Sequence, residues 1–306
     1  MRVAVAGATG VLGRSTMPAL ASAGHDVVGL ARNTPGDRQD LVSIDLLDRD
    51  ALIGFAAGWK PEAIVHLATA IPAEVNPRRV AKDFELTNRL RTEGTANLVE
   101  AAEAAGGARL ISQSICFIYR PGPGLAGEDE PLWEEPLMEP VVPAIKELER
   151  RTLALNEGGA GGTVLRFGHL YGPGTAFAPG GAMSDGAAKR KLPILRRGGS
   201  PGAVFSFIHA DDAGAAVLTA LEKGATGVFN VADDEPAPVS EWLPLLARER
   251  GGKPPRSMPA ALARPVAGAY GVAFMTELRG ASNAKARAEL GWSPSIPSWR
   301  EGFRKA

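Results

Sequence analysis

Residues 1–13 read MRVAVAGATGVLG, an apolar run that passes directly into three glycines at Gly7, Gly10 and Gly13. The run at 3–6 is typical of a buried strand, and residues 14–23 have the composition of a helix. Glycines in such a turn permit a tight bend, close approach of the backbone to a ligand, and close packing of helix on strand. The first helical turn leaves N–H groups free for an anion. We therefore interpret the stretch as a dinucleotide-binding turn; the alternative is a turn that merely favours glycine.

Short apolar runs alternate with helical patterns through the first half of the chain. This βαβ rhythm predicts an α/β fold, with a parallel sheet covered by helices on both faces. The predicted strands are 3–6, 27–31, 64–68, 109–112 and 164–167. The clearest helices are 84–105, with leucines and alanines on one stripe, and 143–157, with Ile145, Leu148, Thr152 and Leu155 inward.

The rhythm changes after Tyr171, where residues 172–182 form a Gly/Pro-rich connection. Residues 204–231 again read as strand, helix and strand, a unit that could return to the main sheet. The tail after Pro236 is helix-rich and interrupted by prolines. We therefore predict a dinucleotide-binding domain of 1–172 plus 204–232, and a substrate-binding domain of 173–203 plus 233–306.

Composition limits the possible classes of protein. The 306 residues carry 34 Lys and Arg against 34 Asp and Glu, and 45% are hydrophobic, which excludes a disordered or fibrous chain. The zero net charge gives no global field for nucleic acid or an anionic membrane. No apolar stretch reaches a membrane span and no secretory signal is visible, so we expect a cytoplasmic protein. The single cysteine, Cys116, lies in an apolar run and is expected to be a buried, inert thiol; no metal site is expected.

Further motifs follow the glycine turn in order. They are Asp45-Leu46, His66-Leu67-Ala68, Glu93-Gly94-Thr95-Ala96-Asn97-Leu98, Ser112-Gln113-Ser114 with Tyr119, Arg166 with Leu170-Tyr171-Gly172-Pro173, Phe207-Ile208-His209-Ala210-Asp211-Asp212, and Glu289-Leu290-Gly291-Trp292-Ser293-Pro294. With the G-x-x-G-x-x-G spacing of the turn, this set resembles the extended short-chain dehydrogenase/reductase family, also called the NAD-dependent epimerase/dehydratase family, nearly from end to end.

The resemblance implies a doubly wound parallel sheet, the Rossmann fold, with a smaller and mainly helical C-terminal substrate-binding part. It also implies that Asp45 and Leu46 flank the adenine, that 67–69 pass beneath the ribose and pyrophosphate, and that 168–170 approach the nicotinamide. The expected cofactor-binding residues are Gly7, Thr9, Gly10, Val11, Leu12, Gly13, Arg14, Arg32, Asp45, Leu46, Leu67, Ala68, Thr69, Ser112, Lys146, Gly168, His169 and Leu170.

Charge at the end of the second strand indicates which cofactor is bound. An acidic residue there would hydrogen-bond a free 2′-hydroxyl, whereas a cation would pair with a 2′-phosphate. The strand ends at Arg32, and Arg14 could supply a second guanidinium to the same phosphate. We therefore expect NADP, with NAD possible; a solvated surface arginine is the alternative.

The catalytic residues of the family are only partly present. In that family a Tyr-x-x-x-Lys pair on one helix transfers the proton, and a serine from the preceding strand positions the substrate oxygen. Aligning Lys146 with the lysine places Val142 at the tyrosine position, and valine cannot carry a proton. Ser114 is the expected serine. The three tyrosines do not replace the missing one by register, because Tyr119 and Tyr171 occupy structural positions and Tyr270 lies far along the tail.

His169 is the candidate substitute acid or base, because it lies on the segment expected to face the nicotinamide and histidine titrates near neutral pH. The alternative is a structural residue that closes a strand end. The acidic run 128–130 could supply a carboxylate instead, or simply be solvated.

Three functions remain open from the sequence. The first is an NAD(P)-dependent oxidoreductase or epimerase acting on a small or sugar-like hydroxyl or carbonyl compound, with an unusual proton donor. The second is a non-catalytic NADP(H)-binding sensor or regulatory protein that lost the tyrosine. The third is a sugar-nucleotide enzyme that holds a diphosphate with Arg190, Lys191, Arg196 and Arg197. The helices 84–105 and 143–157 resemble the pair through which family members form homodimers, so a homodimer is expected.

Overall fold

A computed structural model describes residues 1–34, 38–198 and 202–305. Its centre is a seven-stranded sheet in the order β11-β6-β5-β4-β1-β2-β3, and every neighbouring pair is parallel. The strands are β1 (Arg2–Ala6), β2 (Asp26–Ala31), β3 (Leu41–Ser43), β4 (Ala63–His66), β5 (Arg109–Ile115), β6 (Gly162–Phe167) and β11 (Gly227–Val231). The predicted doubly wound parallel sheet is therefore confirmed, and β11 shows that the chain after residue 204 does return to it.

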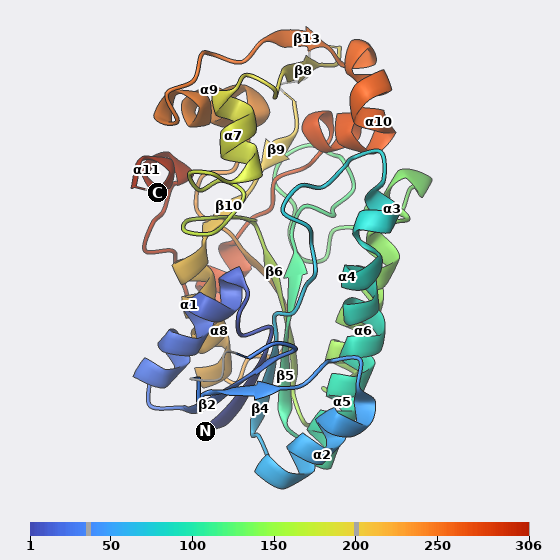
Figure 1. Cartoon of the computed structure of the whole chain (residues 1–306), viewed down its shortest axis with the longest axis vertical. Helices are drawn as coiled ribbons and strands as arrows, with labels where there is room; N and C mark the ends of the chain where they lie inside the picture. The colour runs from blue at the N-terminus through green and yellow to red at the C-terminus, as the bar shows by residue number, and fades with distance from the viewer. Residues whose placement is uncertain (35–37, 199–201, 306) are drawn as a thin grey trace.

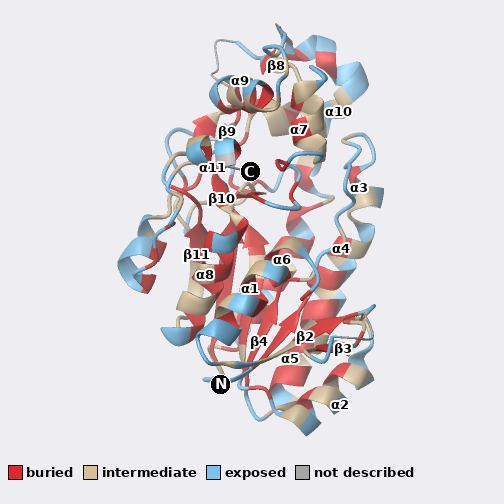
Figure 2. Ribbon diagram, turned by 60° about the vertical axis from the view of Figure 1, so that its left-hand side comes forward, coloured by how far each residue is buried: buried red, intermediate tan, exposed pale blue. Residues whose placement is uncertain are grey.

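Helices cover both faces of the sheet (Figure 1). One face carries α1 (Val11–Ser22) and α8 (Ala210–Glu222), and the other carries α2 (Arg49–Trp59), α5 (Thr95–Ala104) and α6 (Val142–Ala154). Successive side chains of β1 point to opposite faces of the sheet. Val3 and Val5 pack on the α1–α8 side, and Ala4 and Ala6 pack on the α2–α5 side. The strands are consequently apolar throughout, and Figure 2 shows them as the buried layer between partly exposed helices.

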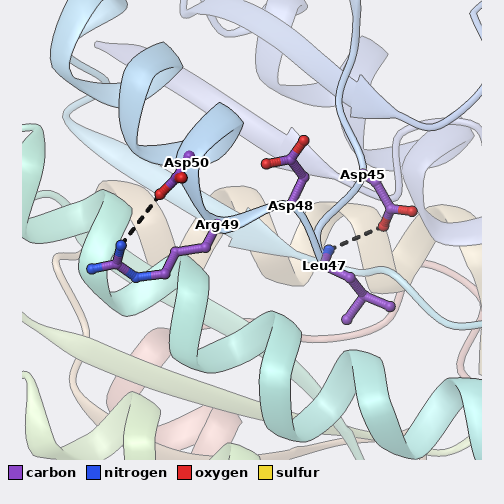
Figure 3. A pocket seen from close by; sticks show the side chains of 5 residues that line it. All are labelled: Asp45, Leu47, Asp48, Arg49 and Asp50. Atoms are coloured by element: carbon purple, nitrogen blue, oxygen red, sulfur yellow. Dashed lines mark hydrogen bonds and ion pairs between the residues drawn. The ribbon is translucent and has the colours of Figure 1, made fainter.

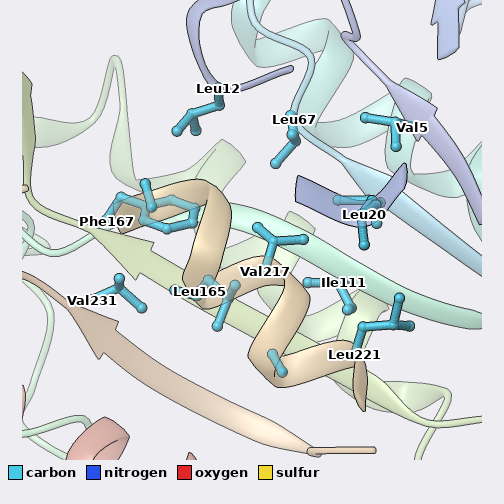
Figure 4. Close-up of a cluster of buried hydrophobic side chains, with 14 of the residues drawn as sticks. Val5, Leu12, Leu20, Leu67, Ile111, Leu165, Phe167, Val217, Leu221 and Val231 are labelled. Atoms are coloured by element: carbon cyan, nitrogen blue, oxygen red, sulfur yellow. The ribbon is translucent and has the colours of Figure 1, made fainter. Parts of the chain in front are cut away.

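The core on the α1–α8 side consists mainly of aliphatic side chains, with Phe167 among them (Figure 4). Leu20, Val217 and Leu221 come from the helices, and Leu165 and Phe167 come from β6. Leu12 and Leu67 lie in the same cluster. This cluster fixes α1 over the sheet, and it thereby fixes the glycine turn that precedes α1.

The predicted long helix at 84–105 is continuous but not uniform. It consists of α4 (Glu85–Arg89), a π-helical turn η1 (Leu90–Gly94) and α5. A π turn widens the helix by one residue and is frequently found at functional sites. Here it carries Arg91 inward, and only 3% of this arginine's surface is exposed.

The remaining elements lie beyond the carboxyl ends of the strands, at the top of Figure 1. Small strand pairs connect them: β7 with β10, β8 with β13, and β9 with β12. These elements are α3 (Val80–Asp83), β7 (His169–Tyr171), α7 (Ala182–Ala188), β8 (Ile194–Arg196), β9 (Val204–Phe205), β10 (Phe207–His209), β12 (Ala237–Pro238), α9 (Val239–Glu249), β13 (Ser257–Pro259), α10 (Ala260–Thr276) and α11 (Trp299–Lys305), with the short turn η2 (Pro136–Met138). The turn η3 (Ala286–Leu290) instead packs against β11, in the core on the α1–α8 side. Among the described residues, no helix is long and apolar enough to cross a lipid bilayer.

Candidate active site

The glycine turn has the geometry that its sequence predicts. Gly7 has a φ of +86°, and a side chain there would place Cβ 2.7 Å from the backbone of Ala68. A Cβ on Gly13 would lie 2.4 Å from the carbonyl oxygens of Gly7 and Ala8. Gly10 precedes α1 without any side-chain cap, so the first N–H groups of that helix stay available to an anion. The turn therefore fits a pyrophosphate.

The two arginines expected near the cofactor have different surroundings. Arg14 Nη1 donates to the Thr9 carbonyl at 2.7 Å, and its Nη2 lies 2.8 Å from the position of a Cβ on Gly174. Arg14 thus lies against the glycine turn. Arg32 follows β2 with an exposed side chain, while its carbonyl accepts a hydrogen bond from Ser43 Oγ at 3.0 Å.

The strand ends around the turn carry the other expected cofactor residues. Asp45 lines a surface pocket with residues 47–50, and its Oδ1 accepts the Leu47 N–H at 3.0 Å (Figure 3). Leu46 is buried, and its carbonyl accepts from Asn97 Nδ2. Leu67 and Ala68 pass directly over Gly7, and Thr69 follows them in an exposed position. Gly168 is held to Val231, the last residue of β11, by a 2.9 Å backbone hydrogen bond.

Ser114 lies in a buried ionic network. Its Oγ donates to Glu149 Oε1 at 2.6 Å. Arg166 donates to the same carboxylate twice, from Nε at 2.9 Å and from Nη2 at 2.6 Å. Arg166 Nη1 also reaches Tyr119 Oη at 2.8 Å, and that hydroxyl donates to Asn230. Ser114 is therefore oriented by α6, through a glutamate rather than a lysine or tyrosine. Ser112 meets the same helix, with its Oγ 2.7 Å from Thr152 Oγ1.

The register of α6 differs from the expected one. Lys146 is half-exposed, and its ammonium pairs with Glu134 at 2.9 Å on the surface. Since Glu149 faces Ser114, the residue four positions earlier, Ile145, shares that face of the helix. Ile145 is 1% exposed, and it lies in one apolar cluster with Val141, the residue just before α6, which is 2% exposed. A shift of one residue turns a helical side chain by about 100°. The structure thus places Lys146 on the solvent side of α6 and Ile145 on the face toward Ser114, which speaks against the expected assignment of Lys146 and Val142 to the lysine and tyrosine positions.

His169 is enclosed by aromatic rings. Its imidazole stacks between Phe117 and Phe205, with centroids 4.0 and 4.1 Å away, and Nδ1 lies 3.1 Å from the Ser206 carbonyl oxygen. Burial lowers the pKa of His169 to about 3, although the bond to Ser206 opposes that shift. The ring is therefore neutral near pH 7. This environment contradicts the expected role of His169 as proton donor and agrees with the structural alternative.

Cys116, the acidic run 128–130 and the basic residues proposed for a diphosphate make contacts within the protein. Burial raises the pKa of the Cys116 thiol to about 12, so this cysteine is an inert thiol as predicted. In the acidic run, Glu128 accepts the Asn230 N–H at 2.8 Å, and Glu130 pairs with Arg279. Among the four basic residues considered for a diphosphate, Arg190 donates to the Pro254 carbonyl and Arg197 pairs with Glu277.

Arg91 is a residue that the sequence reasoning missed. Its guanidinium makes no hydrogen bond or ion pair with any residue that the structure describes, and its Nη1 is completely buried. The available signal was a charged residue on the inward stripe of the predicted helix 84–105, four residues after Thr87 and seven before Leu98, both fully buried.

Comparison with known proteins agrees with this architecture. The model of the NAD dependent epimerase/dehydratase family matches residues 3–232. A "3-diazoavenalumate denitrifying reductase" from Streptomyces sp is 45% identical over 314 residues, covering 99% of both chains. A dTDP-6-deoxy-L-talose 4-dehydrogenase (NAD(P)(+)) from Kitasatospora kifunensis is 27% identical, covering 96% of this chain and 91% of the relative.

Solved structures show the same fold at lower identity. UDP-glucose 4-epimerase from Thermus thermophilus, in complex with NAD, superposes with a TM-score of 0.76 at 24% identity, covering 99% of this chain and 97% of that one. Three relatives in the sequence comparison are named reductase, epimerase and dehydrogenase, and these names support the expected enzyme. The chain therefore belongs to the NAD-dependent epimerase/dehydratase family and is an NAD(P)-dependent enzyme of the oxidoreductase or epimerase type.

Proposed function

We propose that the protein is an NADPH-dependent reductase that replaces the diazo group of an aromatic substrate by hydrogen. The observation that carries the proposal is the apolar character of α6 before Glu149, the partner of Ser114: Ile145, on the same face as Glu149, and Val141, just before the helix, are both buried. The 45% identity over 99% of both chains with the denitrifying reductase supports the same reaction class.

Removal of a diazo group does not require the tyrosine and lysine that transfer the proton in the family. Reduction of a ketone requires a hydride at carbon and a proton at oxygen, so an acid within hydrogen-bond reach accelerates it about 10²–10⁴-fold. The nicotinamide supplies the hydride when it is bound. In an arenediazonium ion, hydride forms the new carbon–hydrogen bond, the carbon–nitrogen bond breaks, and the bonding electrons leave in N2. The hydride brings both the hydrogen and the electron pair of the new bond, so no side chain has to donate a separate proton.

In this reaction Ser114 positions the substrate and does not protonate it. Its proton is held by Glu149 at 2.6 Å, and Arg166 balances the charge of that carboxylate. The proposed reaction therefore requires no substitute for the family tyrosine, whose position the sequence analysis assigns to Val142.

The test measures products rather than cofactor consumption alone. The purified protein is mixed with deuterium-labelled NADPH and the diazonium salt of a hydroxycinnamic acid. We expect N2 release and deuterium on the ring carbon at a rate well above that of heat-inactivated protein. A panel of ketones, aldehydes and keto-sugars should turn over at least a hundredfold more slowly. Comparable turnover of any ketone, or enzymatic denitrification no faster than the uncatalysed reaction, would contradict the proposal.

NADP is the proposed cofactor, with Arg32 as the partner of the 2′-phosphate. The side chain is exposed at the carboxyl end of β2, next to Leu30, whose carbonyl binds the Gly7 N–H at 3.0 Å. A charge-assisted hydrogen bond contributes about 1.5–3 kcal/mol. Arg32→Asp should therefore reverse the order of affinities for NADPH and NADH, whereas Arg89→Asp on α4 should leave it unchanged. Equal dissociation constants for both cofactors in the wild-type protein would exclude the assignment.

We also propose a homodimer through the α4–α5 and α6 layer, which lies on one side of the molecule (Figure 1). Sedimentation at micromolar concentration tests it, and a monomer would contradict it. The division into 1–172 plus 204–232 and 173–203 plus 233–306 stays a prediction.

A further inference from the structure

Arg91 is a buried cation without a partner among the residues that the structure describes. Its side chain projects from the π turn η1, which packs against α6, and 3% of the residue is exposed. Burial lowers the pKa of Arg91 to about 10, so the guanidinium still carries its charge near pH 7. A buried charge that lacks a partner is costly and is normally paired or replaced by an apolar residue. A structural role therefore does not account for Arg91.

The surroundings of Arg91 place it at the carboxyl edge of the sheet. Its charge acts on Tyr270 of α10, on Glu149 of α6, and on His66 at the end of β4. Glu149 does not neutralise it, since both carboxylate oxygens accept hydrogen bonds from Arg166 and one also accepts from Ser114. The guanidinium thus lies near the serine end of the site, with its Nη1 donor free.

An aromatic surface extends from the same place. Tyr270 stacks on Phe274 with ring centroids 6.1 Å apart, Phe274 meets Phe117 edge-on at 6.2 Å, and Phe117 stacks on His169. Rings in such a row favour a flat, unsaturated ligand. The free donor at one end and the rings beside it together suit a planar aromatic molecule that carries an anionic group.

Helix α10, which carries Tyr270 and Phe274, is interrupted at Gly268. The backbone of α10 is non-helical at Gly268, with a φ of +65°, and Tyr270 and Phe274 both follow this kink. A Cβ on Gly271 would lie 2.8 Å from Pro77, so this half of α10 rests closely on the loop after β4. For a ligand to contact Arg91, which is 3% exposed, this half of α10 would have to move about the kink at Gly268.

We propose that Arg91 binds the carboxylate of an aromatic carboxylic acid substrate, with the Tyr270–Phe274–Phe117 row against the ring. A planar guanidinium holds a carboxylate through paired hydrogen bonds, and the missing partner of Nη1 is then supplied by the ligand. This inference deepens the proposed function and rests on it for the reaction, but it makes a separate statement about recognition.

Calorimetric titration of the NADP⁺-loaded protein tests the inference with two probes, cinnamate and its uncharged amide. We expect cinnamate to bind at least tenfold more tightly than cinnamamide, since hydrogen bonds to charged groups are the stronger ones. Arg91→Met should remove this difference and leave the affinity for NADP⁺ unchanged. Arg89→Met removes a positive charge from the exposed side of the same helix, where Arg89 pairs with Glu93, and should retain the preference for the acid.

Thermal denaturation of the same variants separates recognition from folding. If the charge has no structural partner, Arg91→Met should melt at the same temperature as the wild type or higher. A lower melting temperature with unchanged cinnamate binding would overturn the inference, as would equal affinities for acid and amide or no binding of cinnamate. Arg91→Lys keeps the charge without the planar fork and should bind cinnamate with intermediate affinity, which provides a second variant if Arg91→Met does not fold.

The outcomes also separate this inference from the proposed function. Cinnamate binding that depends on Arg91, without denitrification, would preserve the anion site and reject the reaction. Denitrification that is equally fast for the carboxylic acid and for its amide would preserve the reaction and reject the role of Arg91.

Discussion

The glycine turn and the inward face of α6 flank the same edge of the sheet, but they are specified in different ways. At the turn, the backbone itself is the binding surface: Gly7 and Gly13 leave no space for a Cβ. On α6, the surface depends on which side chains face Ser114: Glu149 binds it, and Ile145 lies on the same face of the helix. A local backbone motif is thus readable from spacing alone, whereas a helical register changes completely with a shift of one residue.

Among the variants considered, the largest loss of cofactor affinity is expected from a side chain in the glycine turn, where the neighbouring backbone leaves no space for a Cβ. Gly13→Ala would force a Cβ to 2.4 Å from two carbonyl oxygens, so the turn must open. We expect a loss of NADPH affinity of at least about a hundredfold, together with destabilisation of more than roughly 2 kcal/mol. Calorimetry and urea unfolding measure both.

Gly54→Ala is the control, because Gly54 lies within α2 and a Cβ there meets nothing within 4 Å. It should stabilise the protein by up to about 1 kcal/mol and leave cofactor binding unchanged. Similar behaviour of the two variants would show that the turn does not require glycine for its shape.

On the α6 side, the largest effect is expected from the buried ion pair. Glu149→Leu leaves Arg166 uncompensated, with 5% of its surface exposed, and removes the acceptor of Ser114. Breaking such a pair from one side costs about 3–5 kcal/mol. Urea unfolding should show this loss, and Glu147→Leu on the exposed side of α6 should show far less. Equal effects would mean that the network does not stabilise the helix on the sheet.

A smaller effect concerns His169 and pH. The pKa of His169 is lowered by burial to about 3 in the folded protein, against an ordinary value near 6.5 in the unfolded chain. As the pH falls below about 6.5, His169 binds a proton in the unfolded chain but stays neutral in the folded protein. The folded protein therefore becomes less stable as the pH decreases. Between pH 7 and pH 5 this residue should account for a loss of about 2 kcal/mol.

His169→Phe removes that titration and keeps a flat ring between Phe117 and Phe205. The dependence of stability on pH should become shallower, although His66, whose pKa burial lowers to about 4, retains a share of it. Turnover near neutral pH should survive. Loss of turnover with normal NADPH binding would restore His169 as a proton donor.

The smallest effect is expected at Lys146, the residue to which the motif spacing assigns the role of the family lysine. Lys146→Gln removes only a half-exposed ion pair with Glu134, and such pairs contribute little. The affinity for NADPH should change by less than about twofold. A loss of tenfold or more would mean that Lys146 leaves Glu134 and reaches the ribose when the cofactor binds.

The sequence by itself determined the alternating sheet, the glycine turn and the family. These depend on period-two and helical patterns and on residues whose backbone freedom is local, so neighbours in the chain are sufficient to specify them. It also predicted the inward stripe of α6 correctly, since Ile145, Leu148 and Thr152 are all buried. A stripe with Ile145 inward leaves Lys146 outward, whereas the spacing of the family motif favoured a helix register with Lys146 inward.

Only the tertiary structure decided which polar groups meet. Ser114 and Glu149 are separated by 35 residues, and Tyr270, on which the charge of Arg91 acts, follows that arginine by more than half the chain. The long connection brings α10 over the sheet edge, and the π turn directs Arg91 inward. Whether a buried charge is paired depends on the positions of distant side chains in three dimensions, and no local pattern in the sequence contains that information.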